Sequence, residues 1–358
     1  MSEYTGRKIA IISDIHGLLQ PLEAVIEACK KEGITEIYSL GDNIGDGPNP
    51  LQVIELLERE GIKSIRGNAE EYAIHGTLPF DYIHDKPTRK ANAQWTIDQV
   101  QSKVDVLKKY PVSIDLEVGG KKVALCHFIG DVRSYLYETS TWSFQDRQKQ
   151  GDVGSEIFRN VNSESDRQRV ISTYENCLAE YGEDDPRTQI AKSEMDEPLF
   201  GGKLPSEYDS IIQGHVHFKS VERMGKTDLY TARGLAFGFI QSMDKNPTLS
   251  DDDKAIHGHQ ACFMVLEERA NDRGFDVTER FVSFDRNAMR QAIQNSENAA
   301  FSPSGKFTEI TEEDVMDMAY DPEAISAKEG FDKYYLREKN KTKGFSDVEN
   351  GEGNRWNI

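Results

Sequence analysis

The chain has 358 residues, of which 37% are hydrophobic and 29% are charged, so it can bury one large core and still carry polar additions. Its 62 acidic residues outnumber its 43 Lys and Arg residues and give a formal net charge of -19, which argues against long nucleic acid and membranes as partners. The four cysteines are widely spaced and the N-terminus lacks an apolar signal core, so we expect a reducing, cytoplasmic setting with free thiols.

The first third of the chain alternates strand and helix signals. Three short apolar runs predict buried strands at residues 9–12, 37–40 and 62–66. Apolar residues at helical spacing predict a first helix that ends near Gly33, and Pro50 and Gly61 delimit a second helix. This alternating order predicts a parallel sheet.

The middle of the chain differs in composition. Residues 133–205 are polar and helical in character, and residues 151–200 hold 12 acids against five Lys and Arg, which indicates an acidic helical insertion or cap. Strand signals return at residues 210–213, 228–232, 261–267 and 275–284, and several of them alternate as half-buried antiparallel strands do. We therefore expect a main domain over residues 1–286, including the insertion, and an acidic, partly mobile C-terminal extension over residues 287–358.

Polar clusters follow the predicted strands at the point where each one ends. Asp14 and His16 follow the first strand, Asp42 follows the second, and Asn68 follows the third. Because ligand sites in parallel sheets lie beyond the carboxyl ends of the strands, we expect these side chains at one rim. Two later strands are followed by His127 and by the pair His215 and His217.

These seven side chains predict a metal centre. Imidazole and carboxylate groups together suit first-row divalent ions such as Mn, Fe, Ni or Zn. Seven ligands are too many for one such ion, but they suit two ions about 3.5–4 Å apart that share a carboxylate. Such a pair can clamp a phosphoryl group while activating a water.

The ordered series Asp-x-His, Gly-Asp-x-x-Gly, Gly-Asn-x-Glu, His, Gly-His-x-His resembles the calcineurin-like metallophosphoesterase superfamily over about residues 8–285. The run at residues 45–50 also looks like the bacterial branch of small phosphodiesterases. The resemblance implies an α/β fold in which two mixed β-sheets pack as a sandwich flanked by helices, with the metals at the strand ends. It also implies in-line attack on phosphorus by a hydroxide held on the metals.

The family pattern implies a role for each ligand. Asp14, His16 and His217 would bind the first ion; Asn68, His127 and His215 would bind the second; Asp42 would bridge them. Asp42, Asn68 and His127 are the expected catalytic residues.

The chain departs from the family pattern at two positions. Ala69 stands where many relatives have a histidine that aids the leaving group, and this favours phosphodiesters over monoesters. Arg233 lies where relatives often have Asn-Pro-Gly-Ser, and we expect it to reach the phosphate. Arg66 is a second candidate for substrate binding, with a salt bridge to a nearby acid as an equal alternative.

Other polar residues favour structural interpretations. The sequence favours Asp46 as a turn residue over Asp46 as a hydrogen-bond partner that orients a metal-binding histidine. It favours a solvated loop for His257 and His259 over a metal site. His75 and His84 have no spaced partner, and Cys126 should point away from the site because strand residues alternate.

The expected function is hydrolysis of a small phosphodiester or nucleotide, because the acidic insertion would restrict bulky substrates. One alternative is an interaction module with little catalysis, as in a retromer subunit of this fold. Others are a phosphomonoesterase, a protein phosphatase or a dinucleoside polyphosphate hydrolase, and Gly45 and Ala69 argue against the last two. The sequence makes no prediction of oligomeric state.

Overall fold

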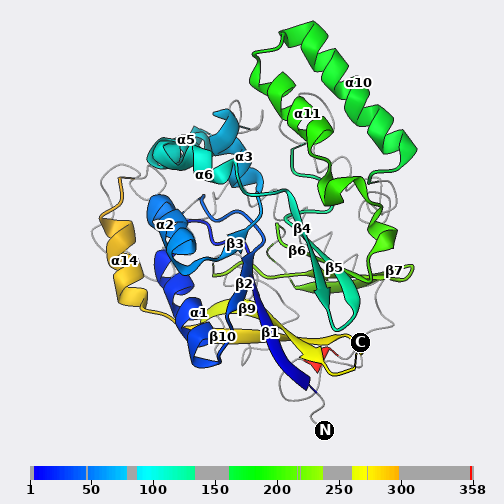
Figure 1. The fold of residues 1–358 in the computed structure, drawn as a ribbon. Coiled ribbons are helices and arrows are strands. Elements are labelled where there is room, and N and C mark those ends of the chain that lie inside the picture. The colour runs from blue at the N-terminus through cyan, green and yellow to red at the C-terminus, as the bar shows by residue number, and fades with distance from the viewer. Residues whose placement is uncertain are drawn as a thin grey trace, which may run out of the picture.

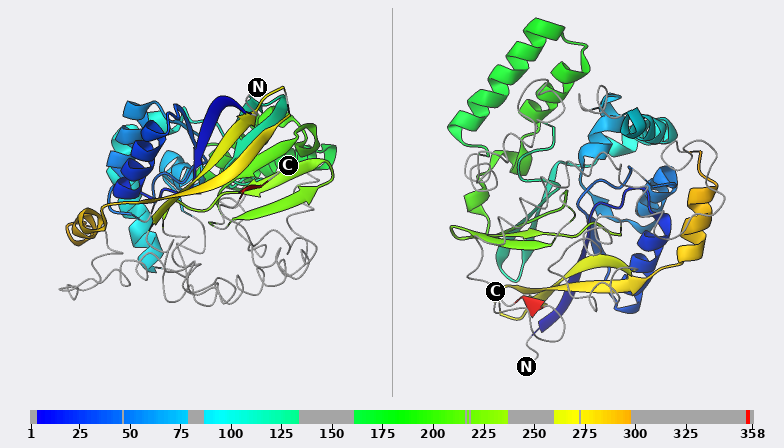
Figure 2. Two further views of the ribbon diagram at one scale, coloured as in Figure 1. Left: turned by 90° about the horizontal axis from the view of Figure 1, so that it is seen from below. Right: turned by 180° about the vertical axis from the view of Figure 1, so that it is seen from behind.

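The computed structural model describes residues 4–45, 47–78, 87–133, 161–215, 217, 219–236, 260–271, 273–297 and 355–356. Two mixed β-sheets pack face to face, with helices α1 (Leu19–Lys31) and α2 (Pro50–Glu60) on the outer side of the first sheet (Figures 1 and 2). This arrangement confirms the predicted α/β fold class.

The first sheet has six strands. In spatial order they are β11 (Arg355–Trp356), β10 (Phe275–Ser283), β9 (Gln260–Arg269), β1 (Tyr4–Ile12), β2 (Glu36–Ser39) and β3 (Lys63–Ser64). Strands β1, β2 and β3 are parallel, as their alternation with α1 and α2 predicts, and β9 runs antiparallel to β1. The apolar side chains of β1 alternate between the helix side, with Ala10 and Ile12, and the space between the sheets, with Ile9 and Ile11.

The second sheet has five strands. In spatial order they are β4 (Ser113–Val118), β5 (Lys121–Cys126), β6 (Ser210–Gln213), β8 (Thr227–Thr231) and β7 (Ser220–Met224). Strands β5, β6 and β8 are parallel, and β6 and β8 are buried along their whole length, so the half-buried antiparallel pattern does not hold for these two. Strands β4 and β7 were not predicted; both pair antiparallel at the two edges of this sheet.

Local signals explain where the first helices end. Pro50 is the first residue of α2, and Gly61 follows its last residue with a left-handed φ of 66°, while its N–H bonds to the Leu57 carbonyl. Helix α1 ends two residues before Gly33, whose φ is 71°. The sequence did not indicate α3 (Asn68–His75), α5 (Pro87–Val100) or α6 (Val104–Leu107).

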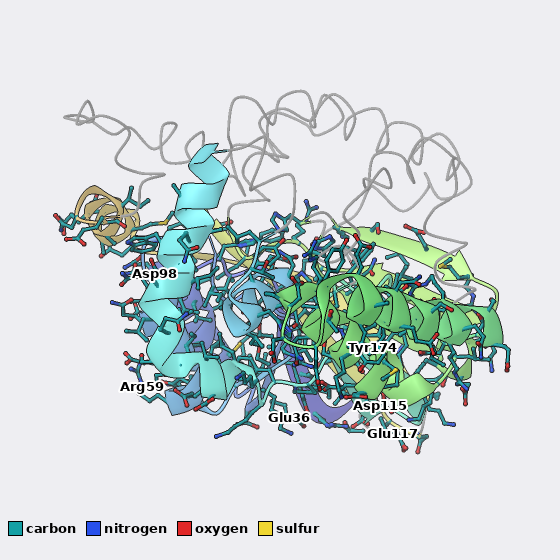
Figure 3. The ribbon with its side chains drawn as sticks, turned by 90° about the horizontal axis from the view of Figure 1, so that it is seen from above. Glu36, Arg59, Asp98, Asp115, Glu117 and Tyr174 are labelled. Atoms are coloured by element: carbon teal, nitrogen blue, oxygen red, sulfur yellow. The ribbon has the colours of Figure 1, made fainter. Side chains whose placement is uncertain are left out.

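The described part of the insertion is helical, as predicted. Helices α10 (Glu164–Tyr181) and α11 (Pro186–Asp196) form a hairpin beyond the strand ends, near α3 (Figure 1). Seen from above, Tyr174 of α10 and Asp98 of α5 lie on opposite sides of the molecule (Figure 3). The hairpin's small core of Cys177, Ile190 and Ala191 packs against Tyr72 of α3.

The chain after β10 continues into α14 (Arg286–Gln294), which packs on α1 and buries Met289 and Ile293. The start of the predicted C-terminal extension is therefore an ordered, amphipathic helix. Most of the predicted extension lies outside the described residues, and the domain boundary at residues 286 and 287 stays a prediction. No helix in the described part of the chain is long and apolar enough to cross a membrane.

Candidate metal centre

The turns that follow four parallel strands and the start of α3 meet at one rim between the sheets. Asp14 and His16 follow β1, Asp42 follows β2, Asn68 begins α3, His127 follows β5, and His215 and His217 follow β6. Backbone contacts hold these turns together, because the Gly214 N–H donates to the His127 carbonyl at 2.9 Å and the His215 N–H donates to the Asp14 carboxylate at 3.1 Å. All seven predicted ligands thus come to one place.

Asp14, His16 and His217 form the first cluster of potential ligands. One possible ligand atom from each lies within 4.8 Å of the others. His217 Nε2 lies 3.2 Å from Asp14 Oδ1 and 3.0 Å from His16 Nε2. These are the three residues that the family pattern gives to the first ion.

The second cluster is centred on His127. Its Nε2 lies 3.2 Å from Asn68 Oδ1, 3.2 Å from His215 Nδ1 and 3.5 Å from Asp42 Oδ2. Asn68 Oδ1 is also 3.0 Å from His215 Nδ1. Asp14 approaches Asp42 and His127 as well, so Asp14 belongs to both clusters by distance, whereas the bridging role of Asp42 stays a prediction.

The protonation states suit metal binding. The His127 Nδ1–H donates to the Leu40 carbonyl at 2.8 Å, which leaves Nε2 with a lone pair directed into the cluster. Burial lowers the pKa of His127, and burial together with the neighbouring imidazoles lowers the pKa of His215 to about 3. Burial alone would raise the pKa of Asp14, but His217, His127 and His16 lower it below its usual range. The imidazoles of His127 and His215, the Asp14 carboxylate and the Asn68 amide oxygen are of the donor types that fit first-row divalent ions.

The backbone is strained at the same positions. Nine non-glycine residues in the described part have a positive φ, and five of them are predicted ligands, with φ between 49° and 70°. They are Asp14, His16, Asp42, His215 and His217. Left-handed backbone costs of order 1 kcal/mol or more per non-glycine residue and persists where the surroundings enforce it, often at functional sites. The fold therefore holds these side chains in their orientation at a cost in stability.

Glu70, the glutamate of the Gly-Asn-x-Glu motif, joins two of the turns that carry predicted ligands. Its fully buried carboxylate accepts backbone N–H groups from Gly67 at 2.7 Å, Asp42 at 2.9 Å and Asn43 at 2.8 Å. Burial raises the pKa of Glu70, and these N–H groups oppose the rise. Its position three residues after the N-cap residue Gly67, as in a capping box, was the available signal.

Two glycines let the turns approach closely. A Cβ on Gly67 would lie 2.3 Å from Asp42 Oδ1, and a Cβ on Gly214 would lie 1.9 Å from Ser13 Oγ. Any larger residue at either position would displace a predicted ligand or its neighbour.

Arg66 forms salt bridges with nearby acids, which is the alternative that the sequence offers to substrate binding by Arg66. Its Nε lies 3.3 Å from Glu71 Oε1, and its Nη2 contacts the Glu197 carboxylate after α11. Arg66, Glu71 and His127 also line one cavity, together with Val112, Phe128, Asp131, Val132, Arg133 and Leu199. Binding of substrate by Arg66 stays a prediction.

Arg233 is paired with Glu279 of β10, a residue that the sequence gave no reason to choose. Arg233 Nε donates to Glu279 Oε1 at 2.9 Å, and Lys219 Nζ lies 3.0 Å from Glu279 Oε2. Burial alone would raise the pKa of Glu279, but Arg233 and Lys219 lower it. The next residue, Gly234, packs beside His217, so this charged trio lies next to the first cluster.

The remaining candidates take structural positions or lie outside the described residues. His75 contacts Glu71 at 3.2 Å, and Cys126 points away from the site into a core cluster with Phe200, as predicted. Ala69 is buried, and its N–H donates to Asp42 Oδ1 at 2.8 Å. Outside the described residues lie Asp46, His84, His257 and His259.

Comparison with known proteins bears on the same segment. The model of the calcineurin-like phosphoesterase family matches residues 7–219, which is more than half of the 358 residues. The chain is 34% identical over 120 residues to an uncharacterized protein of Methanocaldococcus jannaschii, and the match covers 33% of this chain and 48% of that protein. It is 28% identical over 139 residues to serine/threonine-protein phosphatase 2 of Escherichia coli, covering 37% of this chain and 62% of that protein.

The chain thus spans 48% and 62% of the lengths of these two curated relatives. A solved structure of a hypothetical protein from Pyrococcus horikoshii aligns with 80% of this chain and 92% of its own, at 16% identity and a TM-score of 0.49. With the family model covering the turns that carry Asp14, Asp42, Asn68, His127 and His217, the chain belongs to the calcineurin-like phosphoesterase family.

Proposed function

We propose that the chain is a phosphoesterase that works with two divalent metal ions and hydrolyses small phosphodiesters or nucleotides. The observation that carries this proposal is the pair of adjoining donor clusters. Each contains two imidazoles whose ring nitrogens face each other, at 3.0 Å for His16 and His217 and at 3.2 Å for His127 and His215. Two such pairs, with carboxylates against both, support two cations better than one.

The chain's own residues prepare this site for cations and phosphate. Asp14 and Asp42 supply negative charge, the histidine rings supply nitrogen lone pairs, and Asn68 supplies a carbonyl oxygen. When bound, a pair of Mn, Fe, Ni or Zn ions would polarise the phosphoryl group and activate a water. Arg66 and Arg233, each beside a different cluster, would orient the anionic substrate.

The preference for diesters is argued from Ala69. Its methyl group cannot donate a proton, and its N–H is already bonded to Asp42. Hydrolysis of a diester depends less on a proton donor, because the phosphoryl group of a diester carries one charge fewer than that of a monoester. The metals can then supply more of the stabilisation of the negative charge. The limit to small substrates is argued from the hairpin of α10 and α11, which approaches the site through Arg66 and Glu197.

The test compares matched aryl substrates. For the protein loaded with Mn, kcat/KM for bis-p-nitrophenyl phosphate should exceed kcat/KM for p-nitrophenyl phosphate, and Ala69→His should shift the ratio toward the monoester because general acids contribute about 10²–10⁴-fold in rate. Equal or greater monoester activity in the parent would contradict the diester preference. An unchanged ratio in Ala69→His would mean that residue 69 does not face the leaving group.

A further inference from the structure

Arg66 lies between two carboxylates in very different environments. The Arg66 side chain is only 7% exposed; its Nε faces Glu71, and its Nη2 contacts Glu197. The Glu71 side chain is 1% exposed, whereas the Glu197 side chain is 46% exposed. One partner is therefore fixed in the interior and the other is open to exchange with solvent.

The energies of the two pairs differ for the same reason. Removing one partner of a buried pair typically costs about 3–5 kcal/mol, because a charge is left without compensation. A solvent-exposed pair contributes only about 0.2–1 kcal/mol. Glu71 also contacts His75 Nε2 at 3.2 Å and sits on α3, the helix that begins with Asn68. Glu71 thus holds the guanidinium in place, and Glu197 is the partner that an incoming anion can replace.

The guanidinium that Glu197 contacts lies beside the second donor cluster. Arg66 and His127 line the same cavity, and His127 belongs to the second donor cluster. Glu197 directly follows α11, so the hairpin, and not the main sheets, brings this carboxylate to Arg66.

The backbone at residue 197 is anchored independently of the Glu197 side chain. Arg133, which is fully buried and paired with Asp131, donates to the Ser193 carbonyl at 2.8 Å and to the Glu197 carbonyl at 2.8 Å. These bonds hold the end of α11 when the Glu197 carboxylate leaves Arg66. Exchange at Arg66 therefore needs a rotation of one side chain and not the departure of the hairpin.

We propose that Glu197 is an internal competitor for Arg66: its carboxylate occupies the guanidinium in the free protein and is displaced by the phosphoryl group of a bound ligand. Glu197 then sets a threshold for anionic ligands: it admits a phosphoryl group, which the metals also attract, over anions that the metals do not hold. This inference rests on the proposed function in assigning Arg66 to the substrate's phosphoryl group.

The test measures binding of inorganic phosphate to the full chain loaded with Mn, by calorimetry, in the parent and in Glu197→Gln. Because only the Glu197 side of this pair is open to solvent, the pair should be worth about 1 kcal/mol, the upper end of the range for exposed pairs, and removing the competitor should tighten phosphate binding about two- to five-fold. Asp196→Asn is the matched control, because it removes the same charge from the preceding residue, which pairs with Lys192 instead of Arg66.

A two- to five-fold gain in Glu197→Gln with no change in Asp196→Asn supports the proposal. Equal gains in both variants would show a general effect of net charge and would overturn it. Unchanged or weaker binding in Glu197→Gln, or no phosphate binding to either protein, would overturn it too. Because the readout is binding, a chain that binds phosphate in this way but hydrolyses no diester would refute the proposed function and leave the role of Glu197 standing.

Discussion

Glu70→Gln tests whether one buried carboxylate holds the ligand turns. Glu70 Oε2 accepts the N–H groups of Asp42 and Gly67, and Oε1 accepts the N–H and side-chain amide of Asn43. In either orientation, the amide nitrogen of Gln would face two of these donors. Each buried donor left without an acceptor costs about 1–3 kcal/mol, so the free energy of unfolding should fall by about 2–6 kcal/mol.

The assay is urea unfolding of the metal-free protein, together with the number of Mn ions bound after loading. Loss of stability should be accompanied by weaker metal binding, because the turns that Glu70 joins carry Asp42 and Asn68. Glu58→Gln is the control: Glu58 is a partly exposed residue of α2 paired with Lys103, and its change should cost less than about 1 kcal/mol. If Glu70→Gln cost no more than this control and kept full metal binding, the account of the turns would be refuted.

Three further changes test other parts of the account. Asp42→Asn should weaken metal binding at both ion positions, whereas His257→Ala should leave activity within a few-fold. If metal analysis showed that His257→Ala abolished metal binding and Asp42→Asn did not, the predicted ligand set would be wrong. Deleting residues 324–358 should leave metal-loaded, active protein, since no predicted ligand lies there and the deletion removes only the two-residue edge strand β11 from the described sheet; a loss of soluble metal-loaded protein would contradict this. The free energy of unfolding of the metal-free protein should fall as the pH drops below about 6.5, because the pKa values of His127 and His215 are lowered in the folded state and the unfolded chain takes up protons first. Unfolding measured at pH 7 and pH 5 checks this, and equal stability at both would contradict it.

Short-range patterns predicted much of the fold. The apolar runs before Asp14, Asp42 and His127 mark strands, and a polar residue directly after a buried strand is visible in the sequence alone. Strand β4 also carries an alternation of apolar residues at Ile114, Leu116 and Val118, which is a short-range signal for a strand with one buried face.

Contacts between distant segments could not be predicted in this way. The pair of Arg66 and Glu197 joins residues 131 positions apart, and the pair of Arg233 and Glu279 joins residues 46 apart. No local pattern distinguishes these acids from the many others in an acidic chain. Glu70 could be predicted only in part. Its spacing from Gly67 is visible in the sequence, but its hydrogen bond to the Asp42 turn depends on the pairing of β2 with β3.

The number of metal ions bound per chain tests the central claim most directly. The purified 358-residue chain, loaded with Mn and freed of excess metal, should hold close to two ions by elemental analysis, because the donors form two adjoining clusters that share Asp14. A plateau at one ion, or no bound metal, would contradict the two-ion site.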